Sequence, residues 1–299
     1  MKDRMLRVAL VSMKHIGDDP STSPGPRRAE SRCDVAANLE RHEMWLQRGL
    51  DAGANFIGFP EWSLTGWIFD RDRSLTLTSP VLAHLDRWAM KHKVYIGTCF
   101  IEKRGSKLHN DCMLTGPKGR IGIMRKLNLT SGEVKYTSGK LLPVFKVAGC
   151  TMGVAICADG GHDLIRTLSF RGAEVIFAPA GNKLHAYGNH AAGWLKWRTE
   201  SFPKSARDGR VYIAGVSAAG LTENAQKDEE ATVFCGGGAV FDFNGDVVAL
   251  ASVGETKKEC MIVTDLDLDA LRKARSEKFS GGGYPAAMVY NFKRGWKDS

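Results

Sequence analysis

Three residues able to take part in covalent chemistry each lie at the end of a predicted buried strand. They are Glu61 after Asn55–Phe59, Lys126 after Arg120–Met124, and Cys157 at the end of Met152–Ile156. In open α/β sheets, functional side chains gather outside the carboxyl ends of strands. The three side chains can therefore meet at one edge of the fold without disturbing its core.

A thiol, a carboxylate and an ammonium are together suited to attack on an amide carbonyl. Such attack needs a nucleophile, a base and a group that stabilises the oxyanion. Glu61 can accept the thiol proton of Cys157 and return it to the leaving amine. Lys126 can lower the thiol pKa and stabilise the oxyanion, with the backbone N–H of Ala158 as a second donor. Each residue alone also fits a plainer role, as a small buried hydrophobe or a solvated charge.

The elements that must position these residues alternate between strands and helices. Apolar residues recur at helical spacing from Val35 to Leu50, with Asp34 as a cap, and again from Leu82 to Ala89. The turn Gly116–Gly119 predicts a hairpin. Further strands are predicted at Leu6–Met13, Val94–Ile101, Leu142–Val147, Glu174–Ala178, Val211–Val216 and Ile262–Asp265. Further helices are predicted at Asp163–Arg171 and Trp194–Thr199, and a second hairpin around Asn244-Gly245. This order predicts an α/β fold with mixed sheets.

Domain organisation follows from length and composition. With 299 residues and 43% hydrophobic content, the chain can form one large domain, which we place at residues 1–275. The segment after Lys273 has little periodicity. We expect residues 276–299 to be a C-terminal tail in subunit contacts.

The net charge of +9 raises the alternative of nucleic-acid binding. The positive residues are scattered, however, and no nucleic-acid-binding motif is present. The densest stretch holds Arg272, Lys273, Arg275 and Lys278, which we interpret as a solvated face or tail. We expect no nucleic acid partner.

The cysteines and histidines argue against a disulfide framework or a metal site. The seven cysteines include no C-x-x-C pair, and His185 and His190 lack metal-ligand spacing. No signal peptide and no apolar run of transmembrane length is present. We therefore expect a cytoplasmic protein without a membrane partner.

Three segments resemble the motifs of the nitrilase superfamily, the carbon–nitrogen hydrolases. They are Gly53–Glu61, Arg125–Leu129 and Gly153–Asp159, which carry Glu61, Lys126 and Cys157. Glu133, seven residues past Lys126, is similar to a second family glutamate. The resemblance extends from about Leu6 to Asp265 in the family's order.

The resemblance implies an α-β-β-α sandwich of two mixed sheets flanked by helices, paired into a homodimer or a higher homo-oligomer. It implies no metal or organic cofactor. Cys157 would carry a thioester acyl-enzyme that water releases. Glu133 would hold Lys126 and orient substrate or water.

The residues after the nucleophile bear on the substrate. Cys157-Ala158-Asp159-Gly160 is similar to aliphatic amidases and formamidases, whereas nitrilases usually show Cys-Trp-Glu. We therefore predict hydrolysis of a small amide, releasing ammonia or an amine. The alternatives are a nitrile hydrolase, an N-carbamoyl amide hydrolase, an acyl transferase and a non-catalytic binding protein. The predicted substrate-binding residues are Trp62, Trp67, Asn182, Lys183 and His185.

One departure from the family pattern follows the nucleophile. His162 and Asp163 stand where the family commonly has Pro-Glu, and Arg166 comes one residue early. The turn after Cys157 is therefore one residue shorter, which would alter the shape of the pocket. This departure motivates the non-catalytic alternative.

Overall fold

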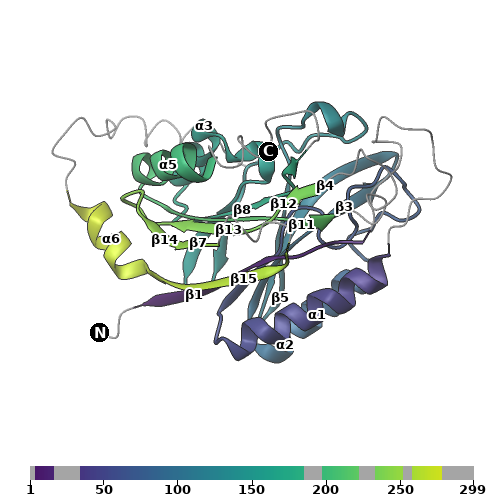
Figure 1. Cartoon of the computed structure of the whole chain (residues 1–299), viewed down its shortest axis with the longest axis horizontal. Helices are drawn as coiled ribbons and strands as arrows, with labels where there is room; N and C mark the ends of the chain where they lie inside the picture. The colour runs from purple at the N-terminus through teal and green to yellow at the C-terminus, as the bar shows by residue number, and fades with distance from the viewer. Residues whose placement is uncertain (1–3, 17–33, 185–196, 222–232, 252–257, 278–299) are drawn as a thin grey trace.

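The computed structural model describes residues 4–16, 34–184, 197–221, 233–251 and 258–277. Two β-sheets lie face to face, and helices cover their outer sides (Figure 1). This arrangement confirms the expected α-β-β-α sandwich.

The first sheet has the strand order β15-β1-β2-β3-β4-β5. Its strands are β1 (Met5–Ser12), β2 (Phe56–Gly58), β3 (Tyr95–Arg104), β4 (Lys107–Gly116), β5 (Gly119–Arg125) and β15 (Cys260–Asp267). The pairs β1–β2 and β2–β3 are parallel, and the other pairs are antiparallel. Helices α1 (Val35–Asp51) and α2 (Pro80–His92) supply apolar residues to a core that includes the outer face of this sheet.

The second sheet has the order β14-β13-β10-β8-β7-β6 and is also mixed. Its strands are β6 (Val144–Val147), β7 (Cys150–Val154), β8 (Val175–Ala180), β10 (Tyr212–Ser217), β13 (Gly238–Phe241) and β14 (Val247–Leu250). Strands β7, β8 and β10 run parallel to one another. Helices α3 (His162–Phe170) and α5 (Phe202–Gly209) pack against each other on its outer side (Figure 1).

The remaining described elements are shorter. A small third sheet contains β9 (Lys183–Leu184), β11 (Ala219–Leu221) and β12 (Val233–Cys235). Helix α6 (Leu268–Ser276) follows β15 and contacts β1. Short 3-10 helices span Ser131–Glu133 and Cys157–Gly160.

The apolar faces of the two sheets pack together into the main core. The ring of Phe56 on β2 meets the ring of Phe177 on β8 edge to face, with 5.2 Å between centroids. A Cβ atom at Gly58 would lie 2.5 Å from the Phe177 ring. The close approach of the two sheets at this point therefore requires glycine, and it brings the carboxyl ends of β2 and β8 together.

Two helices differ from the sequence-based prediction. Residues 194–196 of the helix predicted at Trp194–Thr199 lie outside the described residues, and Trp197–Ser201 forms a π-helical turn leading into α5. The segment around Lys273 is helical, because Asp267 caps α6 and Leu268 and Leu271 are buried. Residues 278–299 of the predicted tail lie outside the described part of the chain.

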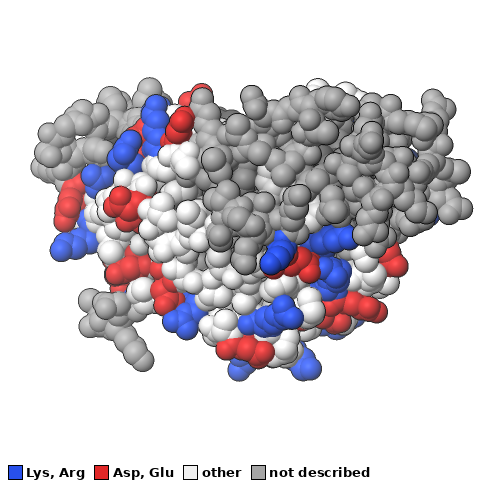
Figure 2. Space-filling model, in the orientation of Figure 1, with Lys and Arg blue, Asp and Glu red and all other residues white. Residues whose placement is uncertain are grey.

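The charged side chains on the described surface are mixed in sign. Figure 2 shows lysines and arginines interspersed with aspartates and glutamates on this face. In the described ranges, no helix is long and apolar enough to cross a lipid bilayer.

Candidate active site

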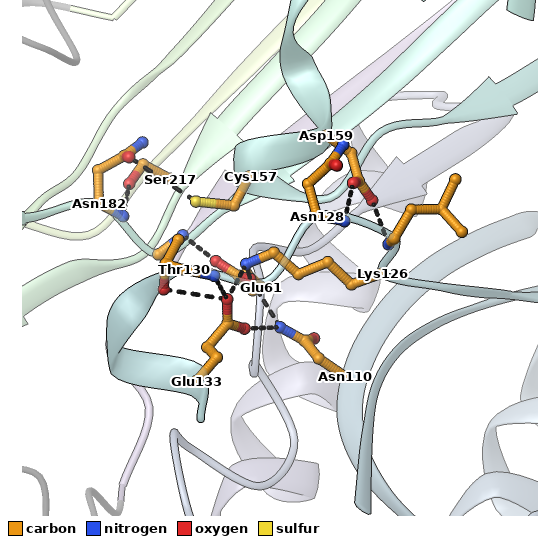
Figure 3. A network of polar contacts seen from close by, with 12 residues as sticks. Glu61, Asn110, Lys126, Asn128, Thr130, Glu133, Cys157, Asp159, Asn182 and Ser217 are labelled. Atoms are coloured by element: carbon orange, nitrogen blue, oxygen red, sulfur yellow. Dashed lines mark hydrogen bonds and ion pairs between the residues drawn. The ribbon is translucent and has the colours of Figure 1, made fainter. Parts of the chain in front are cut away.

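The predicted catalytic side chains converge between the two sheets, at the carboxyl ends of several strands (Figure 3). Glu61 lies in the loop after β2, Lys126 directly follows β5, and Cys157 begins the 3-10 helix after β7. Glu133 ends the 3-10 helix Ser131–Glu133. The structure thus brings together four side chains that the sequence places up to 96 residues apart.

Lys126 joins the two glutamates. Its Nζ lies 2.8 Å from Oε1 of Glu61 and 2.7 Å from Oε2 of Glu133. All three side chains are at most 1% exposed. Breaking a buried ion pair is costly because it leaves an uncompensated charge, so the three groups depend on one another.

Asn110 on β4 contacts both glutamates and was not among the predicted site residues. Its Nδ2 donates to Oε1 of Glu61 at 2.7 Å and to Oε1 of Glu133 at 2.9 Å. Asn110 lies on the first arm of the hairpin, and its backbone carbonyl accepts the N–H of Lys126 on the far side. An amide side chain opposite the lysine was the available signal.

The Glu133 carboxylate is fixed from a second side by a capping box. Its Oε2 accepts the backbone N–H of Thr130 at 2.9 Å and the Thr130 hydroxyl at 3.1 Å. Capping boxes fix the start of a helix through such reciprocal contacts. Glu133 is therefore held in place for Lys126.

Cys157 has a strained backbone and a partly exposed side chain. Its φ of 49° lies in the left-handed region, which non-glycine residues seldom adopt. Its Sγ lies 3.9 Å from Oδ1 of Asn182, to which the thiol donates. Ala158 lies in the first turn of the 3-10 helix, where backbone N–H groups lack intrahelical acceptors.

Burial and charge oppose ionisation of the thiol. Burial is the largest cause that raises the pKa of Cys157, the charge of Glu61 adds to it, and Lys126 acts in the opposite direction. We expected Lys126 to lower the pKa of this thiol. Its contribution has that sign, but burial and the carboxylates outweigh it, so Cys157 is a neutral thiol before substrate binds.

The pKa values of Glu61 and Lys126 complement a neutral Cys157 thiol. Burial raises the pKa of Glu61, although Lys126 opposes the shift. Burial by itself would lower the pKa of Lys126, but the charges of Glu61 and Glu133 raise it above its usual value. Lys126 therefore stays an ammonium, and Glu61 has a higher proton affinity than an ordinary glutamate.

Gly181 holds the second oxygen of Glu61 and was also missed. Its backbone N–H donates to Oε2 of Glu61 at 2.8 Å. A Cβ atom here would lie 2.3 Å from the Trp62 ring and 3.2 Å from that carboxylate oxygen. The backbone can approach Glu61 only because residue 181 lacks a side chain.

Of the five predicted substrate-binding residues, three have side chains among the described residues and two do not. Trp62 and Trp67 are buried and stacked, with centroids 5.4 Å apart, and Nζ of Lys126 lies 5.9 Å from the Trp62 ring. Asn182 lies beside the thiol. The backbone of Lys183 starts β9, but its side chain and all of His185 lie outside the described residues. In the described ranges, no group of three or more His, Cys, Asp or Glu side chains could hold a metal ion.

The sandwich and this cluster define a thiol-containing member of the carbon–nitrogen hydrolases. The profile of the carbon-nitrogen hydrolase family matches residues 7–276, and the chain belongs to that family. It is therefore a member of the nitrilase superfamily and a hydrolase of carbon–nitrogen bonds.

Known relatives include amidases and nitrilases. The omega-amidase NIT2 of Danio rerio is 26% identical over 81% of this chain and 87% of its own length. A nitrilase of Pyrococcus abyssi is 28% identical over 80% of this chain and 86% of its own length. A variant of the amidase from Nesterenkonia sp. AN1 has the same fold, with a TM-score of 0.70, 16% identity and 97% coverage of both chains. In that structure the acetamide moiety of fluoroacetamide is added covalently to the active-site cysteine.

Proposed function

We propose that this chain hydrolyses small linear amides through a thioester on Cys157, releasing ammonia or an amine. The observation that carries the proposal is the buried Glu61–Lys126–Glu133 network beside the partly exposed thiol. The omega-amidase and the Nesterenkonia amidase among the related proteins support an amide as substrate.

Glu61 acts as the general base in the first step. Because Cys157 is a neutral thiol at rest, its proton must leave as sulfur attacks the carbonyl carbon. Oε1 of Glu61 is held by Asn110 and Lys126, and Oε2 by Gly181. The carboxylate takes the thiol proton and delivers it to the leaving nitrogen, so that ammonia or an amine departs and the thioester forms.

Lys126 and Ala158 stabilise the tetrahedral oxyanion. The Lys126 ammonium is buried, and charge interactions in such a site are stronger than in water. The N–H of Ala158, in the first turn of the 3-10 helix, serves as the second donor to the oxyanion. Water then attacks the thioester with Glu61 again as base, and the acid and free thiol are released.

Asn182 is the described pocket residue best placed to contact the substrate. Its Oδ1 faces the thiol, and its buried Nδ2 has no hydrogen-bond partner among the described residues. Buried amide groups are normally paired. We infer that a substrate oxygen accepts this Nδ2 hydrogen bond during the reaction.

The test is ammonia release from a panel of small aliphatic amides, combined with intact-mass analysis of the acyl-enzyme. We expect an acyl adduct on Cys157 and turnover that Cys157→Ala abolishes. Cys260→Ala, a change at another partly exposed cysteine, should keep full activity. Turnover that survives Cys157→Ala, or a broad panel with neither ammonia nor adduct, would contradict the proposal.

A nitrile is the alternative substrate, and the Pyrococcus abyssi nitrilase among the relatives favours it. The same thiol can attack a nitrile carbon. Both reactions release the same acid and ammonia, so parallel assays with a matched amide and nitrile separate them by which substrate is consumed. Transfer of the acyl group to an added amine or hydroxylamine in preference to water would instead indicate an acyl transferase.

A further inference from the structure

His162 connects the helix that follows the predicted nucleophile to a second helix. It is the first residue of α3, which starts after the 3-10 helix Cys157–Gly160 and Gly161. Its Nδ1 lies 3.1 Å from Oγ of Ser205, and its Nε2 lies 3.6 Å from Oδ2 of Asp208. Both partners lie on α5, which packs beside α3 (Figure 1). The imidazole ring therefore joins two segments that are 43 residues apart in the sequence.

The contact between His162 and Ser205 holds in both protonation states of the imidazole. Ser205 is fully buried, and a buried hydroxyl needs a hydrogen-bond partner. A serine hydroxyl can donate to a neutral ring nitrogen or accept from a protonated one. In either state Nε2 can carry a proton and donate it toward Asp208. The bridge between the two helices therefore does not depend on the charge of His162.

Ser205, His162 and Asp208 have the side-chain types of a serine hydrolase triad but not its pattern of exposure. In such a triad the serine hydroxyl attacks the substrate, whereas the aspartate is buried behind the histidine. Here Ser205 is 0% exposed, while the side chains of His162 and Asp208 are 30% and 33% exposed. The hydroxyl is thus closed to substrate, and the arrangement connects two helices instead of forming a second hydrolytic site.

Two glycines weaken the end of the turn that joins Cys157 to His162. Cys157 has a left-handed φ of 49°, and a strained conformation persists only where its surroundings hold it. Asp159 in this turn is fully buried, but Gly160 and Gly161 follow it, and glycine loses more conformational freedom on folding than other residues. Among the described residues, nothing beyond the adjoining backbone lies within 4 Å of a Cβ atom placed at Gly161. His162 is therefore the side chain that can fix this end of the turn.

The sequence also gives a reason why a side chain is needed here. His162 is the first residue of α3, at the point where the family commonly has proline. Proline at the first helical position fixes the dihedral φ and so pre-organises the start of a helix. This chain has no proline there, and its turn is one residue shorter. A side-chain contact with α5 can supply the constraint that proline would otherwise give.

We propose that His162 is a positioning residue that holds Sγ of Cys157 in place for attack on the substrate. It acts through the backbone of the shortened turn and takes no part in proton transfer. Ser205 is a firm partner for this role, because it lies on the buried face of α5 together with Phe202 and Ala206. The inference rests on the proposed role of Cys157 as the nucleophile.

The test combines amide turnover with the rate at which iodoacetamide alkylates Cys157, located by peptide mass. In His162→Ala, kcat should fall about tenfold while KM changes by less than about twofold, because a displaced nucleophile slows attack without removing substrate contacts. Loosening the turn also brings Sγ into water, and burial is the largest cause of its raised pKa. Alkylation should therefore become about threefold faster as turnover falls. If the wild-type protein releases no ammonia, the amidase proposal fails, whereas the alkylation comparison still tests His162.

Three further variants separate the bridge from a general loss of packing. His162→Asn keeps a side-chain amide near the position of Nδ1, so it should retain the contact with Ser205 and recover kcat to within about threefold of wild type. Ser205→Ala should reproduce the loss in His162→Ala, and the double variant should be no worse than either. His84→Ala is the matched control, because this partly exposed histidine on α2 pairs with Glu43 on α1 at 2.6 Å. It should keep the wild-type kcat and alkylation rate.

Several outcomes would overturn the proposal. One is a wild-type kcat and alkylation rate in His162→Ala, and another is an equal loss in His84→Ala. Additive losses in the double variant would show that His162 and Ser205 act separately. Labelling of Ser205 by a fluorophosphonate would instead make that residue a nucleophile. If His162→Ala does not fold, the other two single variants decide, since the proposal requires a loss in Ser205→Ala and near wild-type kcat in His162→Asn.

Discussion

The carboxylate of Asp159 accepts the backbone N–H of Asn128 at 2.8 Å. Its other oxygen accepts the N–H of Leu127 at 3.1 Å. Asp159 lies two residues after Cys157, and Leu127 directly follows Lys126. This fully buried carboxylate therefore ties the turn of the predicted nucleophile to the segment that carries the lysine.

The first prediction concerns this link. In Asp159→Asn, the amide nitrogen cannot accept either N–H, so one backbone donor loses its partner inside the protein. An unsatisfied buried donor costs about 2 kcal/mol, and kcat should fall about thirtyfold if that cost misaligns Lys126 with Cys157. Steady-state kinetics checks this, with the exposed Asp163→Asn as a control that keeps wild-type kcat. Unchanged kinetics in Asp159→Asn would show that the link has no role in alignment.

The second prediction distinguishes two roles of Glu61, as the general base and as a negative charge beside Cys157. In Glu61→Gln, amide turnover should fall about 10²–10⁴-fold because no base remains to take the thiol proton. The Glu61 charge also raises the pKa of Cys157, so its removal lowers that pKa and increases the thiolate fraction. Alkylation by iodoacetamide at pH 8 should therefore become faster while turnover collapses. The exposed Glu40→Gln is the matched control, and parallel losses in both assays would contradict this assignment.

The third prediction concerns Gly181, which has no side chain. The Cβ of Gly181→Ala would overlap the Trp62 ring and crowd Oε2 of Glu61. Its N–H would then move away from the carboxylate, and we expect kcat/KM to fall by at least about tenfold. Gly161→Ala is the control, because a Cβ there meets no atom within 4 Å. Equal activity in the two variants would mean that the Gly181 contact is dispensable.

The fourth prediction concerns acid sensitivity at His42. This fully buried histidine donates from Nδ1 to the carbonyl of Asn38 at 2.7 Å and accepts from Ser63 and Thr98 at Nε2, which fixes the loop after Glu61. Burial lowers the pKa of His42 to about 4. The unfolded chain binds a proton at His42 near pH 6.5, whereas the folded chain does not. The stability contributed by the neutral His42 is therefore complete above pH 6.5 and is lost as the pH falls toward 4.

The expected size is about 2 kcal/mol of unfolding free energy lost between pH 7 and pH 5. Urea denaturation at both pH values measures it. His42→Gln should reduce the difference between the two pH values, whatever its effect on stability at pH 7. The partly exposed His84→Gln should retain the wild-type difference. An undiminished difference in His42→Gln would assign the acid sensitivity to other groups.

Several elements were predictable because their signals are local. The helix Val35–Asp51 carries its cap at Asp34 and a buried stripe that includes Trp45 and Leu46. The hairpin of β4 and β5 turns at Gly116–Gly119, as predicted. Helix α6 was not predicted because its buried apolar stripe consists only of Leu268 and Leu271, with basic residues around them. Its stability comes from packing on the rest of the fold, which a short polar segment does not reveal.

The sequence by itself determined which chemical groups are present and that Glu61, Lys126 and Cys157 follow strands. Only the tertiary structure decided how those groups behave. Asn110 and Gly181 join the site through contacts between segments distant along the chain. The sign of the pKa shift at Cys157 also depends on the fold, because the desolvation of a thiol and the distance to each charge are set by packing between the two sheets.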